Sequence, residues 1–170
     1  MKTNKFIYLL VALIAVFNVN AQETKKETDP LAAETLKSLV ESKNYVFEAY
    51  SALPLKGDIQ KLIDDFSLSV TPKNVISDLP YFGQVYQASL VTTDGGIKFT
   101  SYDFEYTVQD RKNGGWEVRI KAKDIKFAPQ MLLTIMKTGS ATLSVNSSDR
   151  QAISYNGEIK KPKETMPKDQ

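Results

Sequence analysis

Apolar and polar residues alternate with a period of two along most of the chain, which is typical of strands with one buried face. The alternation is clearest over residues 116–122 and 141–145. Further runs, some of them weaker, occur over residues 45–49, 66–70, 86–90, 97–108 and 153–159. Glycine-containing turns separate several of them, at Asp94-Gly95-Gly96, Asn113-Gly114-Gly115 and Thr138-Gly139. About eight antiparallel strands are therefore predicted.

Apolar residues at helical spacing replace this alternation in two places. Asp29 is a favourable N-cap and Pro30 fits the first helical position, so an amphipathic helix is predicted from there to about Lys43. A second, shorter helix is predicted from Asp58 through Ile63, because three of those six residues are apolar and recur near helical spacing.

The hairpin around Asn113-Gly114-Gly115 can be given a register from its side chains. With Val108 opposite Trp116, the aromatic residues of the first strand face the apolar residues of the second. The other face then brings acid opposite base at two positions, Glu105 with Arg119 and Asp103 with Lys121. A slip of one residue would turn the aromatic face outward, so this register is the predicted one.

The alternation changes phase near Thr100-Ser101 and again between Ala122 and Ile125, where a β-bulge or a corner is expected. Gly157 lies in phase with its apolar neighbours, so it is expected to bend the last strand rather than to form a hairpin. Such breaks allow a sheet to curve and close on itself. The predicted fold class is mainly β, a curved antiparallel meander that closes into an up-and-down barrel of about eight strands with an N-terminal amphipathic helix. A curved sheet backed by the helix is the alternative.

The first 21 residues have the pattern of a secretory signal peptide. Lys2 and Lys5 form a positively charged region before an apolar stretch at residues 6–17, and Val19-Asn20-Ala21 fits a cleavage site. That stretch is too short for a transmembrane helix, which needs about 20 apolar residues. The expected mature chain begins at Gln22 and has no integral membrane span. Its expected parts are a flexible linker at 22–28, a single β domain at 29–160 and a disordered tail at 161–170.

Charge and composition exclude several functions. The full chain has 22 Lys and Arg and 20 Asp and Glu, and the two lysines of the signal peptide account for the difference. A neutral mature chain gives no support for nucleic-acid binding. The complete absence of His and Cys excludes disulfides, thiol nucleophiles, His-based acid–base pairs and the usual zinc ligand sets. No cofactor and no metal site is predicted.

Few residues have the pattern of a catalytic site. Lys137-Thr138-Gly139 matches one motif of penicillin-recognising enzymes, but no serine precedes a lysine by three residues, as that chemistry requires. The candidate catalytic residues that remain are two acid pairs, Asp64 with Asp65 and Asp103 with Glu105, which could serve a carboxylate-based hydrolase. Capping, solvation and ion pairing explain such acids more simply, so no enzymatic activity is predicted and no catalytic residue is assigned.

The most unusual segment runs from Leu79 to Tyr86, where Pro and Gly bracket two aromatic residues. Exposed aromatic side chains on a loop often mark recognition surfaces. The candidate binding residues are therefore Pro80, Tyr81, Phe82 and Tyr86. The alternative is that this loop folds its rings over one end of the barrel as a plug. Arg150 is expected either to contact an anion or to pair near Asp149.

Several segments together resemble one protein family. They are Leu-Pro-Tyr-Phe-Gly at 79–83, Gly-Gly-Ile-Lys-Phe at 95–99, Trp-Glu-Val-Arg-Ile at 116–120, Gly-Ser-Ala-Thr-Leu-Ser-Val at 139–145 and Asp-Arg-Gln-Ala-Ile-Ser-Tyr-Asn-Gly at 149–157. The family is an uncharacterised set of exported Bacteroidetes proteins, the domain of unknown function number four-two-five-one. The resemblance covers about residues 37–159 and implies an envelope location and a lipocalin-like β fold. It implies no activity, ligand or catalytic residue.

Three functions remain compatible with these observations. The first is a non-catalytic envelope module, periplasmic or secreted, that binds a small apolar or amphipathic ligand, since an eight-stranded barrel can hold one small molecule. The second is a protein-interaction or inhibitor module that acts on an envelope protein through its aromatic loop or a sheet edge. The third is a carboxylate enzyme. The side chains predicted to point inward are bulky enough to fill a small barrel: Phe66, Phe99, Tyr102, Phe104, Tyr106, Trp116 and Phe127.

Overall fold

The computed structural model describes residues 30–86, 95–127 and 129–162. The predicted signal peptide (1–21) and linker (22–28), most of the strand predicted at 86–90, and the end of the tail lie outside these residues. Helix α2 (Pro30–Glu41) precedes nine strands. They are β1 (Tyr45–Pro54), β2 (Gln60–Val70), β3 (Val75–Leu79), β4 (Ile97–Ser101), β5 (Phe104–Asp110), β6 (Trp116–Ala122), β7 (Gln130–Ile135), β8 (Ser140–Ser147) and β9 (Arg150–Lys160).

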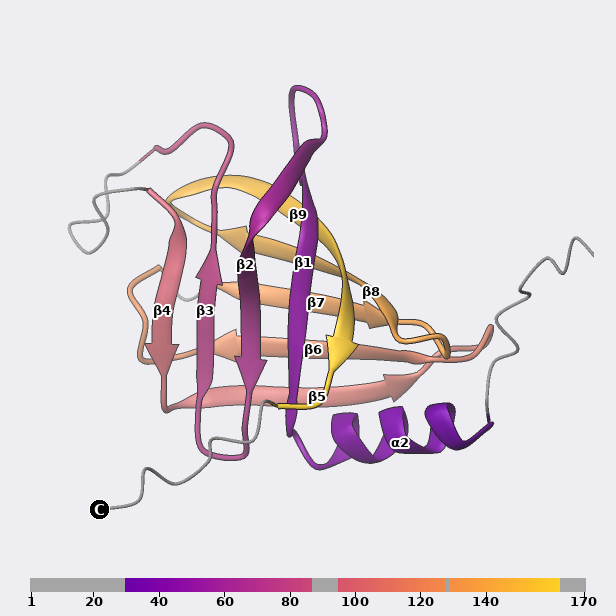
Figure 1. The fold of residues 1–170 in the computed structure, drawn as a ribbon. Helices are drawn as coiled ribbons and strands as arrows, with labels where there is room; N and C mark the ends of the chain where they lie inside the picture. The colour runs from indigo at the N-terminus through magenta and orange to yellow at the C-terminus, as the bar shows by residue number, and fades with distance from the viewer. Residues whose placement is uncertain (1–29, 87–94, 128, 163–170) are drawn as a thin grey trace, which may run out of the picture.

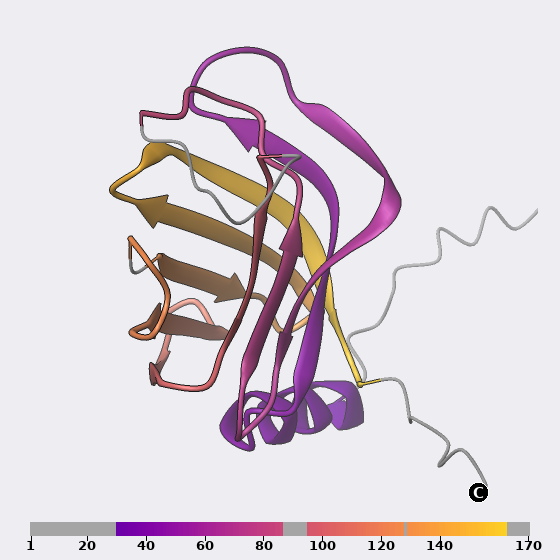
Figure 2. The ribbon, with the colours of Figure 1, turned by 90° about the vertical axis from the view of Figure 1, so that its left-hand side faces the viewer.

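The nine strands form one antiparallel, barrel-like sheet in the order β4-β3-β2-β1-β9-β8-β7-β6-β5. Figure 1 shows β1 to β4 running across β5 to β8, while β9 curves between the two groups and pairs with both β1 and β8. Figure 2 shows the same strands from the side, with α2 at one end of the barrel. The predicted mainly β, curved antiparallel meander is confirmed; the barrel is nearly closed and has nine strands in place of about eight.

The corner predicted near Thr100-Ser101 is where the barrel remains open. Strands β4 and β5 are consecutive in the chain but are the two edge strands of the sheet, and they do not pair within the described residues. Only Tyr102 and Asp103 connect them. The second change of phase, between Ala122 and Ile125, is the start of the loop from β6 to β7 rather than a bulge.

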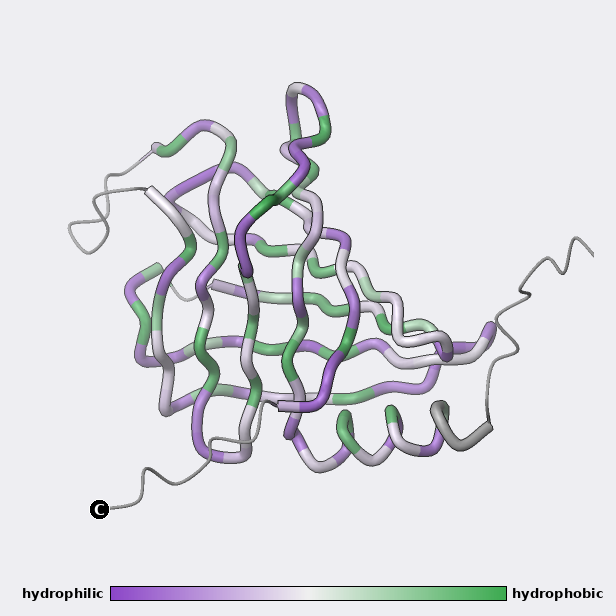
Figure 3. The backbone as a smooth tube through the Cα atoms, viewed as in Figure 1, coloured by the Kyte–Doolittle hydropathy of each residue, from purple (hydrophilic) through white to green (hydrophobic). Residues whose placement is uncertain are grey.

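The inward faces of the strands form a single hydrophobic core. Burial alternates along β6 and β8 as predicted, and the same alternation of hydropathy is visible along the tube in Figure 3. Tyr45, Phe47 and Tyr155 are fully buried, and α2 adds Leu36 and Val40 to the same core. Each large side chain buried in this way stabilises the fold by about 1.5–3 kcal/mol.

The register of the β5–β6 hairpin differs from the prediction by two residues. Asp110, not Val108, lies opposite Trp116, and Val108 lies opposite Val118. The loop is shorter than expected because Gly114 and Gly115 both take positive φ, which lets the Arg111 N–H donate to the Gly115 carbonyl oxygen at 3.1 Å. A shift of two keeps the side chains of the two paired strands on their predicted faces.

The ion pairs predicted from that register are consequently wrong. Glu105 pairs with Lys123, at 3.0 Å between carboxylate oxygen and amine, and Arg119 pairs with Glu117 of its own strand. Among the residues predicted to point inward, Tyr102 is 71% exposed because it lies in the β4–β5 corner. Trp116 is buried, whereas the other members of that set are only partly buried.

The second helix, predicted from Asp58 through Ile63, is absent, because these residues lead into and form part of β2. Ser51 pairs with Lys61 and Ala49 pairs with Phe66, so Tyr50 alone opposes residues 62–65. This large bulge interrupts the period of two, and the interruption mimicked helical spacing. Ile63, expected on an apolar helix face, is 92% exposed.

Gly157 lies inside β9, as predicted, and not in a turn. A Cβ atom at this position would lie 2.1 Å from the Glu48 carbonyl oxygen and 2.6 Å from a ring carbon of Phe47. Glycine is required here because the backbone of β1 and a buried ring approach β9 too closely for any side chain.

We expect Gly157→Ala to lower the free energy of unfolding by about 2–3 kcal/mol, because the added methyl overpacks the join between β1 and β9. Urea denaturation followed by circular dichroism measures the change. The neighbouring Glu158→Ala, at an exposed position, is the control and should stay within about 0.5 kcal/mol of the wild type. A Gly157→Ala protein as stable as the wild type would contradict the close approach of the two strands.

Candidate functional site

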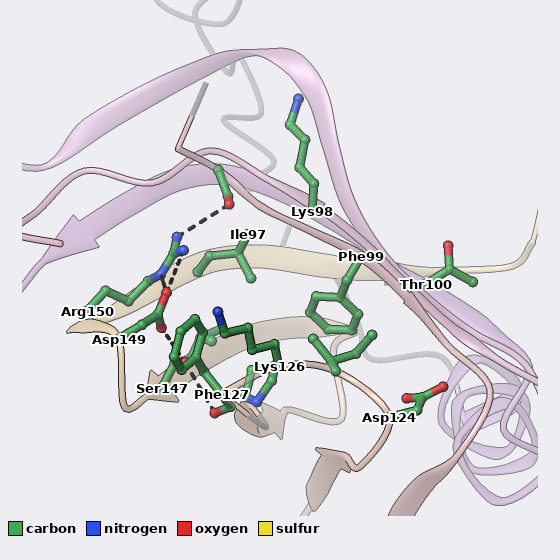
Figure 4. A pocket seen from close by; sticks show the side chains of 14 residues that line it. Ile97, Lys98, Phe99, Thr100, Asp124, Lys126, Phe127, Ser147, Asp149 and Arg150 are labelled. Carbon is green, nitrogen blue, oxygen red and sulfur yellow. Dashed lines mark hydrogen bonds and ion pairs between the residues drawn. The ribbon is translucent and has the colours of Figure 1, made fainter. Parts of the chain in front are cut away.

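A pocket of about 340 Å³ lies beside β4, one of the two edge strands of the sheet (Figure 4). Its other walls are the loop between β6 and β7, the end of β8 and the start of β9. It is lined by residues 96–100 and 124–127 together with Pro129, Val145, Ser147, Asp149 and Arg150. Segments more than 50 residues apart in the sequence therefore meet around one cavity.

Apolar side chains form most of the pocket wall. Ile97 and Phe99 come from β4, Val145 comes from β8, and Ile125 and Phe127 come from the β6–β7 loop. Phe127 has φ 67°, a left-handed backbone that is rare for a residue with a large side chain. Phe99 and Phe127, predicted to fill the centre of the barrel, line this lateral pocket instead and are only partly buried.

A buried ion pair, Arg150 with Asp149, occupies one end of the pocket. Arg150 is 9% exposed and Asp149 is 2% exposed. The Arg150 Nε and Nη2 atoms donate to Asp149 Oδ2 at 2.9 and 2.8 Å, and Nη1 donates to the carbonyl oxygens of Gly95 and Gly96 at 2.9 and 3.3 Å. Of the two predictions for Arg150, pairing with Asp149 is thus confirmed.

The electrostatics of this pair favour the ionised carboxylate. Burial by itself would raise the pKa of Asp149, but hydrogen bonds from the Arg150 guanidinium and the Ser147 hydroxyl outweigh it and hold the pKa below its ordinary value. The guanidinium charge of Arg150 acts in the same direction. The pair therefore stays charged, and it links the β8–β9 turn to the start of β4 through Gly95 and Gly96.

Two residues of the predicted binding loop are held against the end of the barrel. The Tyr81 ring lies 4.9 Å from the Arg150 guanidinium carbon, and the Tyr81 hydroxyl is 2.9 and 3.0 Å from the carbonyl oxygens of Gln84 and Gln151, the two acceptors of its hydrogen bond. The Pro80 carbonyl oxygen accepts a hydrogen bond of 2.6 Å from buried Tyr155. The structure thus places Pro80 and Tyr81 as anchors of the loop.

The other two predicted residues, Phe82 and Tyr86, are exposed, as is Val85 between them. Backbone hydrogen bonds from Tyr86 N–H to the Asp149 carbonyl oxygen (2.7 Å) and from Gln151 N–H to the Gln84 carbonyl oxygen (3.0 Å) attach this stretch to the β8–β9 turn and to β9. The four predicted residues therefore divide into two anchors and two exposed rings, and none of them lines the pocket.

Asp124, at the opposite end of the pocket from Arg150, holds the β4–β5 corner. It accepts hydrogen bonds from the Ser101 hydroxyl and from the backbone N–H groups of Tyr102 and Asp103. The bond from Ser101 contributes most to lowering the pKa of Asp124, and the backbone bonds add to it. The Asp124 carboxylate therefore stabilises the β4–β5 corner, and its side chain has a structural role in the pocket wall.

Sequence reasoning missed the residues of the β6–β7 loop, namely Asp124, Ile125 and Lys126. Their one signal was the change of phase between Ala122 and Ile125, which marks a departure from the sheet but says nothing about what the loop contacts. The acid pairs considered for catalysis lie elsewhere: Asp64 and Asp65 are exposed on the bulge of β2. Within the described residues, no group of three or more acidic side chains is arranged to hold a metal ion.

Comparisons with known proteins identify the family. A family model described as a domain of unknown function, DUF4251, matches residues 27–159. The chain is similar to the crystal structure, at 1.95 Å resolution, of a DUF4251 family protein from Bacteroides eggerthii DSM 20697. The TM-score is 0.57 at 12% sequence identity, and the match covers 77% of this chain and 88% of the other, which supports the fold. No curated protein matches the chain. Because the family model spans most of the sequence, the chain belongs to the DUF4251 family.

Proposed function

We propose that this protein is a non-catalytic binding module that takes a small amphipathic molecule in the pocket beside β4. The observation that carries this proposal is the composition of the pocket: apolar walls around about 340 Å³, with a buried ion pair at one end. Small-molecule sites are typically concave and mostly apolar, with a few fixed polar groups that orient the ligand. The volume lies at the lower end of the range for such sites, which fits a small ligand.

The filled centre of the barrel supports this lateral location. Tyr45, Phe47, Leu143 and Tyr155 occupy the inner faces of β1, β8 and β9 with no exposure to solvent. A ligand therefore enters beside β4, between the open end of the sheet and the β6–β7 loop, rather than in a central cavity. Binding at this point requires no unfolding of the core.

The ion pairs and hydrogen bonds of the acidic side chains support a non-catalytic role. Glu105 pairs with Lys123, Asp149 pairs with Arg150, and Asp124 caps the β4–β5 corner. A carboxylate hydrolase needs two acids that face one substrate site. In the pocket the two acids, Asp124 and Asp149, are both engaged in holding the fold.

We also propose that the chain is exported and acts in the periplasm or outside the cell, on the basis of the signal pattern in residues 1–21. Within the described residues, no helix is long and apolar enough to span a membrane. The mass of the purified mature chain tests this part, because cleavage after Ala21 leaves a chain that begins at Gln22.

A second candidate function is supported by the exposed apolar residues Phe82, Val85 and Tyr86. These side chains lie close together in the sequence on a loop whose backbone is anchored to β9, which is a geometry suited to contacting another protein. A protein-interaction or inhibitor role would act through this loop and would not need the pocket.

Native mass spectrometry of the mature chain, purified from its own envelope without detergent, tests the proposed function. We expect an additional mass on the order of a few hundred daltons that is released on denaturation, as a pocket of this size would hold. Ile125→Trp, which fills the pocket, should abolish the additional mass. The control Ile76→Trp, at an exposed position of β3, should retain it. A bare chain, or a ligand that Ile125→Trp does not displace, would refute binding in this pocket.

A further inference from the structure

We infer that the pocket selects an anionic amphiphile, with the acidic head group at Lys126 and the apolar body against Phe99 and Ile125. This inference rests on the proposed function and specifies the chemistry of its ligand. It follows from the charges around the pocket, since all but one of them are already neutralised or hydrogen-bonded by the protein.

Five charged side chains line the pocket: Lys98, Asp124, Lys126, Asp149 and Arg150. Arg150 and Asp149 neutralise each other at 2.8 Å, with four N–H groups of the guanidinium accounted for by protein acceptors. Asp124 accepts three hydrogen bonds at the β4–β5 corner. The amine of Lys98 lies 3.2 Å from the Asp78 carboxylate. Asp149 is therefore neutralised by Arg150, whereas Asp124 keeps its charge and has both carboxylate oxygens hydrogen-bonded to the corner.

Within the described residues, Lys126 is the one charged side chain of the pocket with neither an ion pair nor a hydrogen bond. Its amine lies 4.9 Å from the centre of the Phe127 ring, and no carboxylate of the described residues forms an ion pair with it. Figure 4 shows the Lys126 side chain folded over Phe127, on the side of the pocket where Asp149 and Arg150 lie. The aromatic ring holds the ammonium near the pocket and keeps part of its surface away from water.

The rest of the pocket fixes the orientation of the ligand. Ile97, Phe99 and Ile125 offer an apolar surface, and the side chain nearest the far end, Asp124, is acidic. An anionic head at Asp124 would face like charge, whereas at Lys126 it gains a charge-assisted hydrogen bond. A ligand with one acidic end and an apolar body therefore matches the pocket in one direction only.

The experiment compares three ligands with the same decyl chain and different head groups, each below its micelle-forming concentration. Decanoate, decanol and decyltrimethylammonium are titrated by calorimetry into the mature chain from which native ligand has been removed. We expect decanoate to bind about tenfold more tightly than decanol, and decyltrimethylammonium to bind most weakly. Lys126→Gln should weaken decanoate about fivefold to tenfold and leave decanol unchanged.

Lys121→Gln is the matched control, because Lys121 is an exposed lysine of β6 that does not line this pocket. It should leave the binding of all three ligands unchanged. Equal affinities for the three ligands, a preference for decyltrimethylammonium, or an unchanged decanoate affinity in Lys126→Gln would overturn the inference and leave the binding function standing. Failure of all three ligands to bind, together with a bare chain in native mass spectrometry, would overturn both.

Discussion

Replacing Asp149 by alanine is expected to lower the free energy of unfolding by about 3–5 kcal/mol, because it leaves the buried guanidinium of Arg150 without its counter-ion. Among the described residues, Arg150 would retain the carbonyl oxygens of Gly95 and Gly96 and the ring of Tyr81 as neighbours that favour its charge. Urea denaturation followed by circular dichroism at pH 7 measures the loss.

The double variant Asp149→Ala/Arg150→Met separates a lost ion pair from a lost contact. Removing both charges should recover a large part of the stability, because well-packed apolar residues replace buried ion pairs at little cost. A double variant no more stable than Asp149→Ala would show that packing, and not the unpaired charge, causes the loss. A single variant within about 1 kcal/mol of the wild type would show that Arg150 is not buried as described.

The same pair predicts how stability depends on pH. The pKa of Asp149 is lowered in the folded state, so its contribution is fully present above the unfolded carboxyl pKa, about 3.9, and is lost as pH falls through the lower folded value. Acid unfolding of the wild type should therefore show a contribution at low pH that Asp149→Ala lacks. If the free energies of unfolding of the wild type and of Asp149→Ala changed with pH in the same way below pH 4, this sign would be wrong.

Trp116→Ala is expected to lower the free energy of unfolding by about 3–5 kcal/mol, because it removes a large side chain from the core and leaves a cavity. Trp116 is 7% exposed and lies between Asp110 of β5 and Ile135 of β7 in the sheet. The surrounding core side chains relax only partly into such a space. Chemical denaturation monitored by circular dichroism measures the change.

Tyr102→Ala provides the matched aromatic control. Tyr102 is 71% exposed at the β4–β5 corner, and its replacement should change stability by no more than about 0.5 kcal/mol. A loss below about 1 kcal/mol for Trp116→Ala would place the tryptophan outside the core. A loss of several kcal/mol for Tyr102→Ala would show that the corner depends on this ring and not only on the hydrogen bonds of Asp124.

The faces of the strands could be predicted from the sequence, because the period of two is a local property of the chain. Trp116, Gly157 and the corner near Thr100-Ser101 were placed correctly for that reason. The register of the β5–β6 hairpin could not be, since it depends on the backbone conformation of Gly114 and Gly115. Both registers put the same residues inside, so hydrophobic pattern alone does not distinguish them.

Residues 58–63 show the limit of local periodicity. Their apolar spacing predicts a helix, but they lead into β2 and form its start, where Tyr50 of β1 opposes residues 62–65. A bulge adds residues to one strand relative to its partner, and the sequence of either strand alone does not contain that relation. Pairing with β1 therefore overrode the local preference.

Composition, the alternation of hydrophobic residues and the glycine turns determined that this protein has a mainly β, curved fold without histidine or cysteine chemistry. The tertiary structure alone decided where a site lies. Lys126 has no distinguishing pattern in the sequence, and it becomes a candidate binding residue only because β4, the β6–β7 loop and the β8–β9 turn enclose one pocket. Local patterns specify which face of a strand is buried, whereas long-range pairing specifies which loops meet.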